Sequence, residues 1–388
     1  MWRLGVLLAT GAAASGGCEA DGSCDAAGML TLSRRQMLRG HEMTRAGINF
    51  TCGESCGILG GVCVNPSPEC LQRRVSTERG PVCYCEVERP PKSSALQRTA
   101  QPSLLREFPF IMTHDSATGF IRKFDPRWRI GQAQTINLVE QVTCGARALD
   151  IRLVIKDGKE EEFFFHHGEG IFSWVSGETL QGEWPKLAAW ARSHPDELLL
   201  LVISHCSVRH GFGNWGSSKC SEGLWPKEFQ ALGLPFEANC ESLSSMTRKE
   251  ALQRSRLQDG GHIMALDGAC VMENWDSSIT SAKGVKSYVE KTMDLMRSRG
   301  YKTLFQVQSF VQQKLFVPMD SKLNGEILTW IANSSLYDGV NLLEINLICS
   351  HGASMAVALG HSISSEDFQS CRTDCHLACQ RHGACEQL

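Results

Sequence analysis

The sequence lacks the features that would assign it to several common classes of protein. Its 39 Lys and Arg residues nearly balance its 42 Asp and Glu residues, and no basic cluster marks a nucleic-acid-binding surface. The apolar stretch at residues 4–14 is too short to span a bilayer of ~30 Å, and no hydrophobic tail follows the last cysteine. No internal repeat suggests a solenoid or propeller. We therefore expect no nucleic-acid partner, no membrane span and no lipid anchor.

Cysteine, by contrast, is abundant, with 18 residues in a chain of 388. The N-terminus has a basic start, then a short apolar stretch, then small residues through Gly17, which is the order of a secretory signal peptide. An even and high cysteine count in a chain with such a signal predicts that most cysteines form disulfides. We expect a secreted, extracellular protein.

The distribution of the cysteines predicts the domain organisation. Eight lie between Cys18 and Cys85, in a segment with few large aliphatic residues, and four lie between Cys371 and Cys385. A segment that cannot build a core must be ordered by cross-links, and the paired CxxC spacing of structural zinc sites is missing. We expect a signal peptide at 1–17, a disulfide-rich module at 18–88, a linker at 89–98, a catalytic barrel at 99–362 and a Cys-rich tail at 363–388.

The middle of the chain alternates between apolar strand-like runs and helical stripes. Nearly continuous apolar strands separated by helices are typical of a parallel sheet covered on both faces. The pattern predicts an α/β fold, an irregular (β/α)8 TIM-like barrel, of which seven strands can be placed. These strands are expected at residues 108–112, 146–154, 163–165, 198–203, 263–266, 304–307 and 342–348.

Charged residues interrupt the second of these strands. Asp150 and Arg152 share one face because residues two apart in a strand point the same way, whereas Leu149 and Ile151 share the other face. A buried charge pair is costly, so the pair indicates a functional site. The alternative is an ion pair that only closes the end of the barrel.

Histidines follow the first and third predicted strands. His114 lies in a Thr-His-Asp-Ser turn, and His166 and His167 are adjacent in Phe-His-His-Gly. Adjacent residues of an extended segment point in opposite directions, so only one of the two imidazoles can face the barrel mouth. The pair could instead ligate a metal, but it lacks the i,i+4 spacing that puts two histidines on one helix face.

Together the three motifs resemble the X domain of the phosphatidylinositol-specific phospholipase C family, in particular its metal-independent bacterial-type and secreted members. The resemblance covers residues 108–360 and follows the family's order, with Thr-His-Asp-Ser at Thr113–Ser116, Gly-x-Arg-x-x-Asp-Ile-Arg at Gly145–Arg152 and His-His-Gly at His166–Gly168. It implies a phosphodiesterase that acts on a phospholipid or a related phosphodiester, with transient contact to a membrane surface.

The resemblance also implies a role for each residue. His114 would be the general base, His167 the general acid, Asp115 the carboxylate that orients His167, and Arg152 the group that binds the phosphate. Calcium-dependent relatives carry an acidic residue where this chain has Arg152, so we expect no metal requirement, with Ca²⁺ as the alternative.

Two departures from the family limit what the resemblance implies. Bacterial members pair the base with an aspartate on the final strand, whereas this strand offers Glu344 and Asn346, and the sequence does not decide between them. The family's inositol contacts are not matched at residues 265–268 and 306–309. A different phospholipid, an inositol glycolipid anchor or a soluble diester is therefore expected as substrate.

Two other functional classes remain open at this point. The barrel could be the scaffold of a secreted binding or toxin-like protein, which would have no need of the complete set of His, Asp and Arg. A metal-dependent enzyme of the glycerophosphodiesterase kind would lose activity with a chelator.

Overall fold

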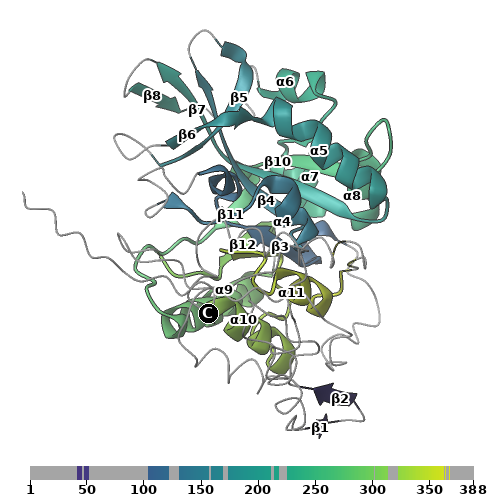
Figure 1. Ribbon diagram of the computed structural model, residues 1–388, viewed down its shortest axis with the longest axis vertical. Helices are drawn as coiled ribbons and strands as arrows, with labels where there is room; N and C mark the ends of the chain where they lie inside the picture. The colour runs from purple at the N-terminus through teal and green to yellow at the C-terminus, as the bar shows by residue number, and fades with distance from the viewer. Residues whose placement is uncertain are drawn as a thin grey trace, which may run out of the picture.

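A computed structural model of the chain describes residues 42–45, 48–51, 104–121, 131–156, 159–168, 174–210, 214–217, 225–300, 302–312, 322–361, 363 and 367 (Figure 1). The predicted signal peptide, the linker and nearly all of the Cys-rich tail lie outside these residues. Of the predicted disulfide-rich module, only β1 (Glu42–Arg45) and β2 (Ile48–Thr51) are described, and they pair antiparallel. Among the described helices, none combines the length and the apolar character needed to cross a membrane.

A curled parallel sheet forms the centre of the molecule (Figure 1). Its strands follow the spatial order β11-β12-β13-β3-β4-β7-β10-β9, and each neighbouring pair is parallel. The strands are β3 (Phe110–Thr113), β4 (Ala148–Lys156), β7 (Leu198–His210), β9 (Phe236–Glu237), β10 (His262–Asp267), β11 (Val271–Glu273), β12 (Leu304–Gln308) and β13 (Leu342–Ile345).

Because β13, the last described strand, pairs with β3, the first strand of this sheet along the chain, the sheet curls back on itself. Within the described residues no ladder joins β10 to β11, which are connected by the short 3-10 helix η6 (Gly268–Cys270). The fold is therefore α/β with a curled, TIM-like parallel sheet, and a fully closed eight-stranded barrel stays a prediction.

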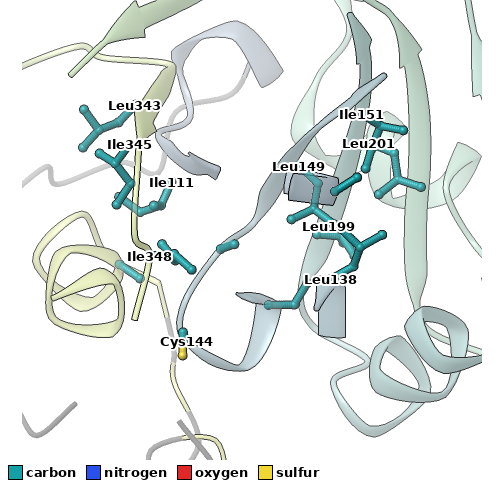
Figure 2. Close-up of a cluster of buried hydrophobic side chains, with 14 of the residues drawn as sticks. Ile111, Leu138, Cys144, Leu149, Ile151, Leu199, Leu201, Leu343, Ile345 and Ile348 are labelled. Carbon is teal, nitrogen blue, oxygen red and sulfur yellow. The ribbon is translucent and has the colours of Figure 1, made fainter. Parts of the chain in front are cut away.

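Helices pack against the outside of the sheet (Figure 1). Figure 2 shows the apolar side chains of β3, β4, β7 and β13 that form the buried layer between sheet and helices, among them Ile111, Leu149 and Leu201. The helices are α4 (Leu138–Thr143), α5 (Leu180–Ser193), α6 (Trp225–Ala231), α7 (Cys240–Ser245), α8 (Arg248–Arg254), α9 (Ala282–Arg299), α10 (Lys322–Asn333) and α11 (Gly352–Ala358).

Local sequence signals set the helix ends. Ser281 caps α9 by accepting a hydrogen bond from the amide of Gly284, and Gly300 ends the helix with φ 74°, a conformation that suits glycine. Two disulfides are described, Cys144–Cys349 and Cys240–Cys270. The first joins residues 205 positions apart, from the end of α4 to the segment after β13.

The prediction of a parallel strand at residues 163–165 is wrong, because the observed strand is antiparallel to its neighbours. Residues 163–165 belong to β5 (Lys159–His167), which pairs antiparallel with β4 and with β6 (Trp174–Thr179). The physical reason is the short connection between Lys156 and Lys159, since a parallel pair needs a crossover of about a dozen residues or more. The histidines at the end of β5 therefore reach the sheet on a hairpin.

Candidate active site

The predicted site residues lie together near the carboxyl ends of β3 and β13, beside the middle of the longer strand β4. His114 and Asp115 follow β3 directly. Asp150 and Arg152 belong to β4, Glu344 belongs to β13 and Asn346 follows it. His167 is the last residue of β5. This edge of a parallel α/β sheet is where enzymes of this architecture place their active sites.

Asp115 is the centre of the cluster. Its Oδ1 lies 2.7 Å from Nε of Arg152, and its Oδ2 lies 2.8 Å from Nδ1 of His167 and 3.3 Å from Nε2 of His114. Asp115 has φ 44°, a left-handed conformation that Asp adopts more readily than most residues, and its amide donates to Oδ2 of Asp150 at 2.9 Å. Burial alone would raise the pKa of the Asp115 carboxyl, but Arg152 and the two histidines hold it well below its usual range. The carboxylate is thus ionised at neutral pH and lies between two imidazoles.

His114 is hydrogen-bonded at one ring nitrogen and lies close to a carboxylate at the other. Its Nδ1 lies 2.9 Å from Oδ1 of Asn346, so Asn346 is the candidate on the final strand that bonds this ring. Burial lowers the pKa of His114, and the opposing effect of Asp115 only partly offsets it. When Nδ1–H donates to Asn346, Nε2 of the neutral ring has its lone pair available to accept a proton, which is what a general base requires.

Arg152 is flanked by two carboxylates. Its Nη2 lies 3.1 Å from Oδ2 of Asp150, in addition to the contact with Asp115. Burial would lower the pKa of Arg152, but these two carboxylates raise it above its usual value. Its side chain is 28 % exposed, whereas those of both aspartates are buried. The guanidinium therefore remains accessible to an anion.

A β-bulge in the neighbouring strand supports Asp150. The register of β4 and β7 shifts after Ile151, so that Arg152 pairs with His205 and Ser204 is the extra residue. The hydroxyl of Ser204 donates to Oδ1 of Asp150. Bulges commonly re-aim a side chain next to an active site.

The two adjacent histidines diverge, as the extended backbone requires. His167 bonds Asp115, whereas Nε2 of His166 lies 2.9 Å from Nδ1 of His205, away from the carboxylate. Burial, then His205, lowers the pKa of His166 to about 3, so this ring stays neutral. His166 and His167 do not converge as a metal-ligand pair.

Glu344 is fully buried beside His114 and Asp150. One side-chain ligand atom of each residue lies within 4.8 Å of the others, a spacing that could suit a metal ion. These ligand atoms do not fit a metal ion, however. Both Asp150 oxygens accept hydrogen bonds, His114 bonds Asn346, and the guanidinium of Arg152 lies against Asp150. Burial, reinforced by Asp150, raises the pKa of Glu344 well above its usual value and favours the neutral acid.

Sequence reasoning missed several neighbours of the site. The ring of Phe310, which follows β12, stacks on His114 with a centroid distance of 4.1 Å, and neither Phe310 nor Ser204 carries a motif that marks it. Gly131 lies against His167, where an added Cβ would come within 2.7 Å of the ring. Only a glycine allows this approach, but a single glycine among 36 gives no usable signal.

No protein-family model and no curated protein matches the chain. Among solved structures, the chain is similar to phosphatidylinositol-specific phospholipase C from Listeria monocytogenes, with 13 % identity, a TM-score of 0.46, and coverage of 69 % of this chain and 98 % of that chain. It is also similar to a variant of the enzyme of that name from Staphylococcus aureus, with 13 % identity, a TM-score of 0.43, and coverage of 70 % and 98 %.

Proposed function

We propose that the protein is a secreted phosphodiesterase of the phospholipase C type, a phosphoric diester hydrolase or lyase that cleaves a phospholipid or a related phosphodiester. The observation that carries the proposal is the arrangement around Asp115. One carboxylate lies between two imidazoles and an arginine, at the carboxyl edge of a parallel sheet. A scaffold or binding protein has no need to place these four side chains in contact.

His114 is the general base of the proposed reaction. Its ring is neutral because burial lowers its pKa, and Nε2 accepts the proton of the attacking hydroxyl. Asp115, 3.3 Å from that nitrogen, stabilises the imidazolium that forms. The attacking group is a hydroxyl of the substrate, which gives a cyclic phosphate, or water where the substrate has none.

His167 is the general acid, and Asp115 orients it. The contact between Nδ1 and the carboxylate at 2.8 Å fixes the ring so that Nε2 carries the proton for the leaving oxygen. Arg152 binds the phosphate oxygens, where its planar guanidinium stabilises the charge that develops on them in the transition state. Asp150 holds Arg152 in place.

The proposed reaction needs no metal ion, because Arg152 provides the positive charge beside Asp150 and Asp115. The substrate is expected at a membrane surface or in solution in an extracellular compartment, where the two described disulfides would be stable.

Two alanine variants test the assignment. His114→Ala and His167→Ala should each lower kcat by about 10²–10⁴-fold, the usual contribution of a general base or acid. His262→Ala is the matched control, since His262 lies at the amino end of β10 and should leave turnover unchanged. Activity would be measured on phosphatidylinositol, an inositol glycolipid anchor, lysophospholipids and a soluble aryl phosphodiester, with and without EDTA. Full activity in both variants would refute the proposal, and loss with EDTA would favour the metal-dependent alternative with Ca²⁺.

A further inference from the structure

The face of the His114 ring is covered by an aromatic side chain. The rings of His114 and Phe310 are 15° from parallel and their centroids are 4.1 Å apart. Phe310 is 2 % exposed, so its own ring is packed in the protein. This contact joins residues 196 positions apart, from the segment after β3 to the segment after β12.

The backbone that carries Phe310 is tied on both sides. The amide of Ser309 donates to the carbonyl of Glu344 at 2.8 Å, and the amide of Gln312 donates to the carbonyl of Ile279 at 2.7 Å. The side chain of Gln308 bonds Asp276 twice, accepting from its amide at 2.9 Å and donating to its carbonyl at 3.3 Å. A segment fixed at these points presents the Phe310 ring in one orientation.

The stacking complements the hydrogen bond from Asn346. A single bond at Nδ1 leaves the imidazole free to tilt about that contact, whereas a flat ring against its face restricts the tilt. The charged and titratable groups that face His114 are Asp115, Asp150, Arg152 and Glu344. None of these groups lies between His114 and Phe310, so on that face hydrocarbon replaces water.

We propose that Phe310 is a positioning residue for the base: it fixes the plane of the His114 ring and closes one face of that ring to water. Removal of the Phe310 ring would hydrate the imidazole. Burial is the largest cause of the lowered pKa of His114, so hydration raises this pKa. This inference rests on the proposed role of His114, but its first test does not require activity.

The test is a proton NMR titration of the His114 ring in the ligand-free protein, with its signal assigned by its loss in His114→Gln. The pH midpoint of the His114 titration should be higher in Phe310→Ala than in the wild type. In Phe310→Leu it should lie between these two values, and in Phe310→Trp it should return toward the wild-type value. Phe229→Leu is the matched control, since Phe229 is equally buried but packs against Phe163 and Phe236. It should leave the midpoint unchanged.

Kinetics give the second readout. Phe310→Ala should lower kcat by about 10-fold or more, because misplacing a reacting group is costly, with little change in KM. The acidic limb of its kcat/KM profile should move to higher pH. Phe310→Leu is used if the alanine variant is poorly folded by circular dichroism. A wild-type midpoint in both Phe310→Ala and Phe310→Leu would overturn the inference. A different result would overturn the catalytic role of His114 but not the positioning role of Phe310: a raised titration midpoint in Phe310→Ala together with full activity in His114→Ala.

Discussion

Two arginines five positions apart, one fully buried and one partly exposed, behave differently in this structure. Arg147, just before β4, has no exposed side-chain surface and bonds Glu197 at 3.0 Å, while Nη1 donates to two backbone carbonyls. Its guanidinium also lies 5.0 Å from the ring of Trp190. Arg152, within β4, bonds two carboxylates but keeps 28 % of its side chain exposed.

The difference separates a structural charge from a candidate catalytic one. The fixed neighbours of Arg147 surround it on all sides, so no surface is left for a ligand. Arg152 is held from one side and is open on the other. Arg147 precedes β4, whereas Arg152 lies within β4 beyond its last pair with β3, Thr113–Leu149, and so on the carboxyl side of β3. Active sites of parallel α/β sheets form at the carboxyl ends. The amino end should therefore govern stability, and the carboxyl end should govern activity.

The largest expected effect is on stability at the amino end. Arg147→Met leaves Glu197 without its closest partner, and breaking a buried ion pair on one side costs about 3–5 kcal/mol. We expect the free energy of unfolding, measured with urea by circular dichroism, to fall by this amount. The double variant Arg147→Met/Glu197→Gln should recover part of the loss. An unchanged unfolding free energy in the single variant would show that the network around Arg147 does not stabilise the fold.

The next effect is on activity at the carboxyl end. Arg152→Met should lower kcat/KM by about 10²–10³-fold, the usual result of removing a donor to a developing oxyanion. Arg152→Lys should recover little, because an ammonium cannot replace a planar two-donor contact. The unfolding free energy should fall less than in Arg147→Met, since Asp115 keeps both histidines as partners. The contrast between a structural Arg147 and a catalytic Arg152 would be contradicted if the two variants lost equal stability and Arg152→Met kept its kcat/KM.

The sequence predicted the strands of the curled sheet better than their connections. The apolar runs that became β3, β10, β12 and β13 were located within a few residues, because buried strands need continuous aliphatic residues. The direction of β5 was wrong because an apolar run looks the same in a parallel and an antiparallel strand. Only the length of the connection distinguishes them.

The site was predictable where polar groups interrupt apolar strands. His114, Asp115, Arg152 and His167 do lie in contact, as their motifs suggested, although their catalytic roles remain predictions. Phe310 and Ser204 were not predictable. Phe310 is one of 16 phenylalanines and reaches His114 only through the fold. Ser204 bonds Asp150 only because of a register shift in β7.

The smallest effects concern pH, and the two ends of the sheet should respond with opposite signs. At the amino end, burial would raise the pKa of Glu197, but His361 and Arg147 lower it from 4.5 to about 2. The unfolded chain therefore binds more protons between these values, and stability present above pH 4.5 is lost as the pH falls toward 2. At the carboxyl end, burial and Asp150 raise the pKa of Glu344, so its neutral form is favoured in the folded state and stability is lost as the pH rises above 4.5.

Two glutamine variants measure these contributions separately. At pH 7, Glu197→Gln should lower the unfolding free energy and Glu344→Gln should raise it, because the first removes a stabilised carboxylate and the second removes a destabilised one. Between pH 6 and pH 3 the urea midpoint should fall less steeply for Glu197→Gln than for the wild type. A decrease of similar size in both variants at pH 7 would mean that the Glu344 carboxyl is ionised and well paired in the folded protein. The electrostatic contrast between the two ends would then be absent.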